Sequence, residues 1–405
     1  MSVATHKHAQ KVLPPGWRWV RLGDFMPRKS GTVNPATCPS ETFTLFSIPS
    51  FDRGTPETVL GKSIGSSKQL VQPGDVLLSK IVPHIKRTWV VENLYGARLI
   101  ASTEWIIFRT EKAVPDYLKY ALLDEDFHKS FMDTTSGVGG SLTRARPSLV
   151  AKLEIPLPPL PEQQRIAAIL KEQMAAVDKA RAAAEARLEA VKALPAAFRN
   201  QIFPRPDQKL AVDWKRKALG AVLEITSGQV DPKDARYKDL PHVNGENIES
   251  GTGRLLNVRS AAEDNMTSGK YLFESGVVLY SKLRPYLMKV SVAHFRGLCS
   301  ADMYPLTPHL HEMTLEFLQQ LLLSEAFTNY AVAESQRARM PKLNRDQLMA
   351  YSAPVPPLAD QRRLAARLRE QMDAAEKARA AAEAELDAIN ALPAALLRRA
   401  FNGGL

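Results

Sequence analysis

Two stretches of the chain place their apolar residues at the spacing of an amphipathic α-helix. The segments before them instead alternate short apolar runs with polar turns. The stripe positions are Ile166, Leu170, Val177, Leu188 and Val191 in the first stretch, and Leu364, Leu368, Leu386 and Ile389 in the second. A narrow stripe, thinned to alanine in its middle, is typical of two helices that approach closely along a seam. We therefore predict that these residues form the seam of a helix pair.

The two stretches are copies of one sequence. Residues 156–203 begin with PLPPLPEQQRIAAIL and residues 354–401 with PVPPLADQRRLAARL, and about 29 of the 48 aligned positions are identical. The leading prolines exclude helix, whereas the body is rich in the strongest helix formers. Pro195 and Pro393 stand at the same place in both copies, and we expect each to interrupt its helix and leave a short helical tail.

The order of the segments predicts how the helices run. We assign residues 1–155 and 204–353 to two globular domains, and 156–203 and 354–405 to the two spacer helices. The first helix ends, and the second begins, beside segment 204–353, so helices that pair along their length must be antiparallel. The alternative is that each helix lies on its own domain as a single amphipathic element. The length of the helices, about nine turns, favours the pair.

The two large segments also echo each other. QPGDVLLSKIVPHIK at residue 72 resembles ESGVVLYSKLRPYLM at residue 274, and a helical pattern follows each. Several short strands with one or two helices are typical of an α+β domain. The predicted fold is therefore α+β: two mixed domains joined by two long antiparallel helices that form a coiled-coil spacer, with an internal repeat of approximate twofold symmetry.

The composition sets limits on function. The chain has 45% hydrophobic and 24% charged residues, as globular proteins do. Its net charge of +11 is spread without a basic block, so charge alone makes nucleic-acid binding plausible and no more. Cys38 and Cys299 lie far apart, which argues against a disulfide framework or a zinc site. With no apolar run of about 18 residues and no signal-peptide pattern, we expect a cytoplasmic protein without a membrane partner.

No catalytic constellation is legible. GTPETVLGKS resembles a phosphate-binding loop at residues 61–63, but Pro56 stands where the partner glycine is needed. Asp207, Asp213 and Lys215 are the residue types of a nuclease site, yet they lie in a proline-containing linker. Motifs that hold a methyl donor or its target base are also missing. We therefore expect no catalytic residue, no metal site and no cofactor bound by this chain.

Basic residues gather in the presumed loops of both large segments. A loop after a strand can offer lysine to a phosphate and arginine to a guanine edge. Each residue alone is more simply explained as a solvated surface charge, but the set is placed equivalently in the two halves. The predicted DNA-binding residues are Lys80, Lys86, Arg87, Arg144 and Arg146 in the first half, and Lys282, Arg284, Arg337, Arg339, Lys342 and Arg345 in the second.

The doubled proline-to-helix stretch, the opening LPPGWRWVRLGD and the stretch GDVLLSK resemble the specificity subunit of type I restriction–modification systems. This resemblance implies two target-recognition domains that each read half of a bipartite, asymmetric site in double-stranded DNA. It also implies two methyltransferase subunits and restriction/translocase subunits as partners, with S-adenosylmethionine, ATP and Mg bound there. Ala359-Asp360 in the second copy, where the first has Pro161-Glu162, is a mild departure from the repeat.

Two other readings stay open. The same recognition module could serve an enzyme that carries restriction and methylation fused on another chain. A protein–protein scaffold, which grips two protein ligands and no DNA, is a reading from a different class. Charged residues on the outer helix faces are candidates for docking a methyltransferase, or are simply solvated; they are Arg165, Glu172, Arg181, Arg363, Glu370 and Arg379.

Overall fold

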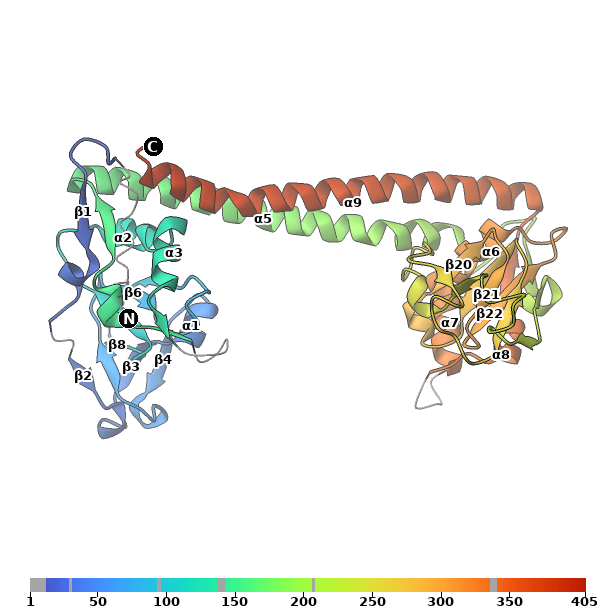
Figure 1. Cartoon of the computed structure of the whole chain (residues 1–405), viewed down its shortest axis with the longest axis horizontal. Coiled ribbons are helices and arrows are strands. Elements are labelled where there is room, and N and C mark those ends of the chain that lie inside the picture. The colour runs from blue at the N-terminus through green and yellow to red at the C-terminus, as the bar shows by residue number, and fades with distance from the viewer. Residues whose placement is uncertain (1–11, 29–30, 93–95, 137–142, 206–207, 336–340) are drawn as a thin grey trace. The chain divides into compact units, whose positions relative to one another are not determined.

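The chain forms two compact units in a computed structural model (Figure 1). Unit 1 comprises residues 1–185 and 385–405, and unit 2 comprises residues 186–384. The boundary between the units crosses both long helices, so each unit contains part of each helix. The structure describes residues 12–28, 31–92, 96–136, 143–205, 208–335 and 341–405.

Unit 1 contains two main sheets. The mixed sheet has the order β2 (Thr32–Val33), β5 (Lys68–Leu70), β8 (Arg98–Ala101), β3 (Thr42–Phe46) and β4 (Glu57–Leu60). Strands β3 and β8 are parallel and the other neighbours are antiparallel. The second sheet is antiparallel, in the order β7 (Thr88–Val90), β6 (Val76–Ser79) and β9 (Trp105–Phe108). Every residue of β6 and β9 is buried, as expected of strands covered on both faces.

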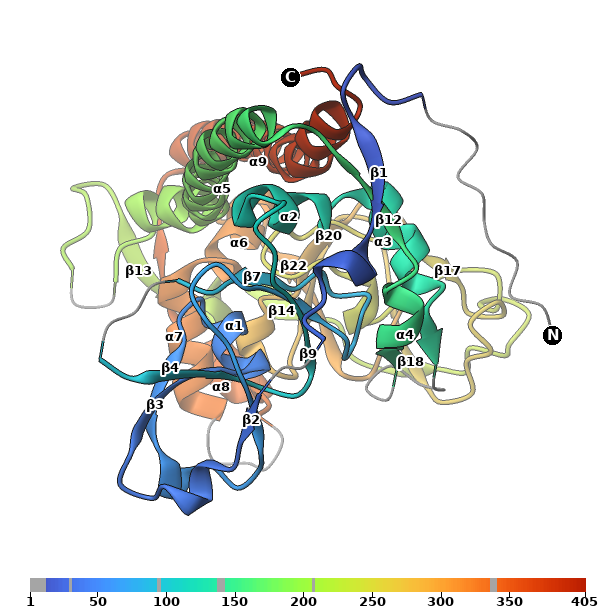
Figure 2. The ribbon, with the colours of Figure 1, turned by 90° about the vertical axis from the view of Figure 1, so that its left-hand side faces the viewer.

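Short helices and ribbons complete unit 1. Helices α2 (Pro115–Ala121) and α3 (Glu125–Met132) lie between the long helix α5 and strand β6 (Figure 1). Strand β1 (Arg18–Arg21) pairs with β12 (Glu154–Leu157), as Figure 2 shows from another side. The remaining elements are α1 (Ile48–Asp52), α4 (Pro147–Val150) and the ribbon of β10 (Thr135–Ser136) and β11 (Arg144–Ala145).

Unit 2 repeats this topology. Its mixed sheet has the order β15 (Gln229–Val230), β18 (Lys270–Phe273), β21 (Gly297–Cys299), β16 (Pro241–Val243) and β17 (Arg259–Ser260), with β16 and β21 parallel. The antiparallel sheet has the order β14 (Leu223–Ile225), β22 (Met303–Pro308), β19 (Val277–Ser281) and β20 (Val290–Ala293). The other elements are the β13–β23 pair (Lys215–Ala218, Ser352–Val355), α6 (Leu315–Leu322), α7 (Glu325–Ser335) and α8 (Arg345–Ala350). Each unit is thus α+β, and strand β14 is an addition of unit 2.

The two long helices continue through their prolines. Helix α5 spans Leu160–Ile202 and helix α9 spans Leu358–Phe401, so the expected interruption at Pro195 and Pro393 is wrong. A proline removes a single helical N–H and crowds one carbonyl, which need only bend a helix. Alanine-rich flanks favour helix on either side, and the segments beyond the prolines are packed: Phe203 and Phe401 are 2% exposed.

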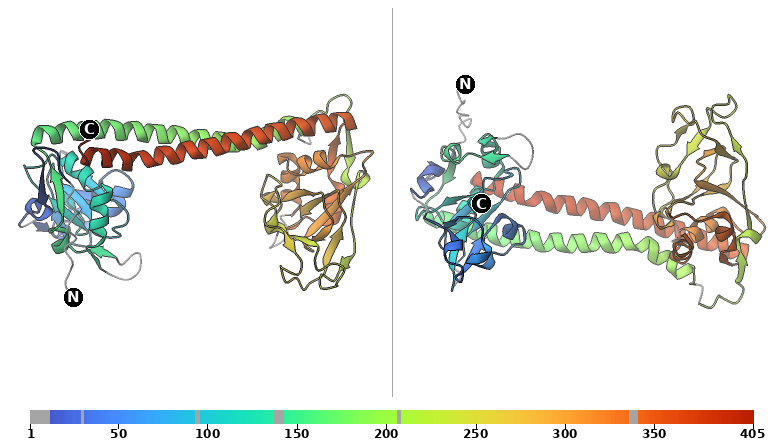
Figure 3. Two further views of the ribbon diagram at one scale, coloured as in Figure 1. Left: turned by 45° about the horizontal axis from the view of Figure 1, so that its top comes forward. Right: turned by 90° about the horizontal axis from the view of Figure 1, so that it is seen from below.

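Each unit contains contacts between the two long helices. In unit 1, Ile166 and Leu170 of α5 share one core with Leu397, Ala400 and Phe401 of α9. The Phe401 ring lies 5.5 Å from that of Tyr117 in α2, and the C-terminus therefore lies against unit 1 (Figure 3). These helix ends pack into a domain core as well as against each other. A helix pair and a helix that lies on its own domain, the two alternatives considered from the sequence, therefore occur together.

The arrangement is reciprocal in unit 2. There Leu368 of α9 shares a core with Phe203, which directly follows α5, and the Phe203 ring lies 5.3 Å from that of Phe317 in α6. Phe203 and Phe401 are aligned residues of the sequence repeat. The core of each unit is therefore completed by the beginning of one long helix and the end of the other.

A buried glutamine fixes the start of each long helix to its unit. Gln163 accepts a hydrogen bond from the Val114 N–H (2.8 Å) and donates to the carbonyls of Lys112 (3.2 Å) and Pro158 (2.8 Å). Gln361 accepts from the Thr314 N–H (2.8 Å) and donates to the carbonyls of Glu312 (2.7 Å) and Pro356 (2.9 Å). Both side chains are almost fully buried, with every polar atom bonded, as buried amides require. We call these two residues the glutamine clamps.

Candidate nucleic-acid interface

In unit 1, the loop after strand β6 is joined to the basic segment 143–146 by backbone hydrogen bonds. The Ala145 N–H donates to the Lys80 carbonyl (2.8 Å) and the Val82 N–H to the Thr143 carbonyl (3.1 Å). Ile81 and Arg144 form an antiparallel bridge. Two clusters separated by about 60 residues in the sequence thus form one surface, which we call loop site 1.

Unit 2 builds the same framework from different residues. The Leu343 N–H donates to the Lys282 carbonyl (3.0 Å), the Arg284 N–H donates to the Pro341 carbonyl (2.9 Å), and Leu283 bridges Lys342. We call this surface loop site 2. Arg144 and Lys342, matched by the sequence repeat, occupy the same position in the two frameworks.

Both loop sites hold a non-glycine residue in the left-handed backbone region. Val82 and Arg284, at equivalent positions, each have φ of 49°. This conformation is rare for residues other than glycine, Asn and Asp, and especially so for a β-branched side chain. It persists only where surrounding contacts determine it, and such residues cluster at ligand-binding sites. In unit 2, Arg284 directly precedes the short 3-10 helix Pro285–Leu287. This helix contains Tyr286, which is 52% exposed.

Several predicted DNA-binding side chains are accessible. Arg146 and Arg284 are exposed, and Lys80 is half-buried. Lys342 and Arg345 are exposed beside the start of α8, where one Arg345 nitrogen donates to the Ile225 carbonyl (3.3 Å). These five residues remain candidates because none of them is buried.

Two further candidates form ion pairs at the surface. Lys86 pairs with Glu125 (2.5 Å) and lowers the pKa of that carboxyl group, while Arg144 pairs with Glu104 (3.3 Å). Partly exposed pairs of this kind contribute about 0–1 kcal/mol. A DNA phosphate can therefore compete for either cation.

The structure corrects the assignment of Arg87 and Lys282. Arg87 is 9% exposed and makes a bidentate pair with Asp52 (2.7 and 2.9 Å), which lowers the pKa of that carboxyl group. The Lys282 ammonium donates to the Ala301 carbonyl and lies 5.1 Å from the centre of the Tyr304 ring; burial lowers its pKa. Both cations are engaged by groups of their own unit, so neither is kept as a proposed DNA contact. Arg337 and Arg339 lie outside the described residues.

The predicted seam residues are all shielded from solvent to some degree. Ile166, Leu170, Val177, Leu188 and Leu368 are buried, and Val191, Leu364, Leu386 and Ile389 are half-buried. On the outer faces, Arg165 pairs with Glu162, Arg363 with Asp360, and Arg379 with Glu376 within their own helices. Arg181 pairs with Asp178 and also donates to Asn390 of the other helix (2.9 Å), whereas Glu172 and Glu370 are exposed.

The motifs set aside in the sequence have ordinary structural explanations. A Cβ atom on Gly61 would meet the carbonyl oxygens of Cys38 and Pro35 at 2.1 and 2.5 Å, so close backbone approach explains this glycine. Lys215 is an exposed residue of β13, whereas Asp207 lies outside the described residues. Over the ranges that the structure describes, no three His, Cys, Asp or Glu side chains gather as metal ligands would. Within the same ranges, no helix is both long and apolar enough to cross a bilayer.

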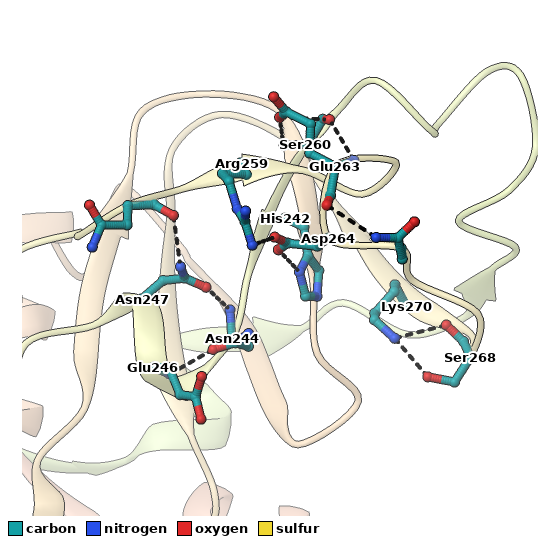
Figure 4. A network of polar contacts seen from close by, with 12 residues as sticks. His242, Asn244, Glu246, Asn247, Arg259, Ser260, Glu263, Asp264, Ser268 and Lys270 are labelled. Carbon is teal, nitrogen blue, oxygen red and sulfur yellow. Dashed lines mark hydrogen bonds and ion pairs between the residues drawn. The ribbon is translucent and has the colours of Figure 1, made fainter.

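A buried histidine of unit 2 was not foreseen from the sequence. His242 of β16 is 1% exposed, and its Nδ1 lies 3.0 Å from Asp264, which also pairs with Arg259 at 2.7 Å (Figure 4). Burial lowers the pKa of His242, although Asp264 opposes the shift. Its Nε2 is buried and has no hydrogen-bond partner among the described residues. The strand alternation alone gave no sign of this network, because Asp264 and Arg259 come from another segment.

Comparisons with known protein families and with curated proteins agree with each other. The profile of the type I restriction modification DNA specificity domain matches twice, over residues 14–188 and 211–385. The EcoDI specificity subunit of the Escherichia coli type I restriction enzyme is 33% identical over 208 residues, which cover 51% of this chain and 45% of that protein. The chain thus aligns with less than half the length of this curated relative.

Two solved structures have a similar fold. One, described as the basis of complex assembly and conformational transition of the type I R-M system, has a TM-score of 0.79 at 24% identity and covers 97% of this chain and 100% of its own. The HsdS subunit of Thermoanaerobacter tengcongensis has a TM-score of 0.65 at 25% identity, covering 97% and 98%. The chain belongs to the type I restriction–modification DNA specificity family and carries two of its domains.

Proposed function

We propose that the chain is the DNA sequence-specificity subunit of a type I restriction–modification complex, and that each unit reads one half of a bipartite, asymmetric site. The observation that carries this proposal is the pair of matched DNA specificity domains, which share one topology and differ in their loop sites. A shared frame holds each loop site in place, and different side chains on it give two different half-sites.

Within each loop site, the solvent-facing cations are the proposed DNA contacts. They are Lys80, Lys86, Arg144 and Arg146 in unit 1, and Arg284, Lys342 and Arg345 in unit 2. Arginine suits guanine edges through bidentate hydrogen bonds, and lysine suits phosphates as a point charge. The positive φ at Arg284 and the 3-10 helix that follows it support a role in positioning, since contacts to bases require a fixed backbone.

We further propose that α5 and α9 act as an antiparallel coiled-coil spacer between the two readers. Support comes from contacts inside each unit: the start of α5 meets the end of α9 in unit 1, and the reverse pair of ends meets in unit 2. A helical spacer cannot change length without adding or losing residues, so it fixes the distance between half-sites.

The chemistry belongs to partners in this proposal. Two methyltransferase subunits supply adenine methylation with S-adenosylmethionine, and restriction/translocase subunits supply ATP- and Mg-dependent cleavage, in the cytoplasm. The family is described by DNA specificity and not by a reaction, which agrees with a non-catalytic role for this chain. The outer faces of the long helices are the proposed docking surface for the methyltransferases.

The test is to lengthen both helices and map methylation. Insertion of four residues, one turn, into each helix adds about 6 Å, comparable with two base-pair steps of about 3.4 Å. Single-molecule sequencing of methylated adenines should then show the same two half-sites with a spacer longer by one or two base pairs. An unchanged spacer with normal methylation would contradict the spacer role, and a host methylome that does not change when the gene is removed would contradict the function itself.

A further inference from the structure

Unit 2 contains a cavity of about 510 Å³ beside its part of the long helices. Its wall is formed by the end of α5 (Pro195, Arg199), the beginning of α9 (Met372, Glu376) and the loop that contains Gly251. This volume is in the range of about 300–1,000 Å³ that ligand pockets occupy. A hollow of unit 1, beside Trp19 and Phe401, measures about 40 Å³.

Arg199 in the cavity wall is a buried cation without a carboxylate partner. It is 4% exposed, and it donates from Nε to Gln320 (2.9 Å) and from one terminal nitrogen to the Gly251 carbonyl (2.9 Å). Among the described residues, no carboxylate comes within ion-pairing distance of it. Burial lowers the pKa of Arg199 to about 10, so the side chain stays charged at neutral pH. Both of its hydrogen-bond acceptors are neutral, and a buried charge normally has an anionic partner.

The sequence repeat shows that the fold does not require this arginine. The aligned residue at the end of the other long helix is Leu397, which is buried in the core of unit 1. Leucine therefore fills the equivalent place in the same topology. Burying the charge of Arg199 costs desolvation free energy that a leucine would not cost. The arginine at this position therefore indicates a ligand that supplies the missing negative charge.

The other charges of the wall limit what this ligand can be. Arg254 is balanced by Glu249 (2.7 Å) and Glu376 (3.4 Å), and Arg379 by Glu376 and Glu383 (both 2.7 Å). The wall thus carries several carboxylates in addition to Arg199, its one buried cation. A nucleic-acid backbone, with one charge per about 1.7 Å of duplex, would bring further phosphates against those carboxylates. A ligand that brings a single carboxylate to the buried arginine, and otherwise apolar and basic groups, fits this wall better than a nucleic-acid backbone does.

We propose that this cavity is a docking site for an acidic side chain of a protein partner, with Arg199 as its ion-pairing residue. Arg199 can bind a carboxylate through its remaining N–H groups while Gln320 and Gly251 hold the guanidinium in place. Apolar wall residues, including Met372 and Pro195, contact the segment that carries the acid. This inference does not depend on the DNA-recognition function.

The test uses the full chain, labelled with ¹³C in its methionine methyl groups, and two blocked peptides. Acetyl-Lys-Glu-Leu-amide presents the acid, and acetyl-Lys-Gln-Leu-amide is its neutral match. The Met372 signal should move with the Glu peptide at millimolar concentration, and affinity should fall at least tenfold with the Gln peptide and in R199L. Met303, buried in β22, is the internal reference, and R398M, at an exposed arginine near the end of α9, should behave as the unmodified chain.

Further measurements separate binding from folding. R199L should raise the melting temperature of unit 2, since it removes the uncompensated charge, and R199K should fold normally but bind the Glu peptide more weakly than the unmodified chain. No response of Met372 to the Glu peptide, or an equal response in R199L, would overturn the proposal. Displacement of the peptide by equimolar inorganic phosphate, or by a short DNA duplex, would overturn it in favour of a phosphate site.

Discussion

Unit 1 and unit 2 agree where residues hold the fold and differ where residues face solvent. Both have the same strand order in the mixed sheet, an antiparallel strand pair that leads into a long helix (β1–β12 and β13–β23), and a glutamine clamp with equivalent partners. Their loop sites share a backbone frame but not their side chains. Lys80 is half-buried at the strand end, whereas the lysine at the equivalent place in unit 2, Lys282, is buried with its ammonium over the Tyr304 ring.

The difference teaches that a basic residue at a matching position need not have a matching role. The backbone framework fixes the position of the Cα atom, and the surrounding side chains decide whether the charged group reaches solvent. The same holds for Arg199 and Leu397, and for His242, whose counterpart in the equivalent register of unit 1 is the buried Leu45. The following variants test the shared parts first and the divergent parts afterwards.

The largest expected effect comes from the aromatic residues at the helix ends. F401A should destabilise unit 1, and F203A unit 2, each by about 3–5 kcal/mol, because a fully buried ring is lost from a packed core. Hydrogen exchange followed by mass spectrometry should locate the loss of protection in α2 for F401A and in α6 for F203A. L392A, at a residue 43% exposed on α9, is the matched control. Protection lost equally from both units by either variant would refute the reciprocal packing.

The glutamine clamps should come next. Q163L and Q361L each leave a buried backbone N–H and two carbonyls without their partner, and should cost about 2–3 kcal/mol of unfolding free energy. Q164L, at the exposed neighbouring residue, should change it by less than about 0.5 kcal/mol. Urea unfolding measures all three variants. A small effect of Q163L beside a large one of Q361L would mean that the two clamps are not equivalent.

A smaller effect is expected from the loop-site residues, and it separates binding from folding. R284A should weaken specific DNA binding by the assembled complex about tenfold, as loss of one bidentate base contact does. K282M removes an internal cation and should leave the dependence of DNA affinity on salt concentration unchanged. Fluorescence anisotropy at several salt concentrations measures both. A reduced salt dependence in K282M would show that Lys282 contacts DNA after all.

The smallest effect is the pH dependence of unit 2. Burial lowers the pKa of His242 in the folded state, so the unfolded chain binds the proton more tightly. The contribution of His242 to stability is therefore complete above the unfolded pKa of about 6.5 and is lost as the pH falls from there toward the folded pKa. Asp264, whose pKa is lowered by His242 and Arg259, adds a further loss only near the pKa range of carboxyl groups.

H242N keeps a donor for Asp264 but cannot titrate, so it should flatten the stability of unit 2 between pH 7 and pH 5. Melting curves across this pH range measure the change. Unit 1 has Leu45 in the equivalent place, and the pH dependence that it owes to His128, whose pKa burial also lowers, should be the same in H242N and in the unmodified chain. An unaltered pH profile in H242N would assign the step to another group.

The sequence was enough to predict the repeat, the α+β character and the shielded stripe of the helices, because these follow from local periodicity. It could not reveal partners that only the fold brings near. Arg87 meets Asp52, which lies 35 residues away, and Gln163 meets backbone atoms about 50 residues earlier. The low helix propensity of proline also led to a wrong prediction, an interruption of both helices at Pro195 and Pro393. There, tertiary packing of the following residues outweighs one lost hydrogen bond per helix.

The central claim is that the two units read two different half-sites independently. Methylated adenines should be mapped in the host with the unmodified gene and with a triple variant of loop site 2, R284A/K342A/R345A. The account predicts that one half of the bipartite motif relaxes or disappears while the other half and the spacer stay the same. Equal relaxation of both halves, or an intact motif at full methylation, would contradict it.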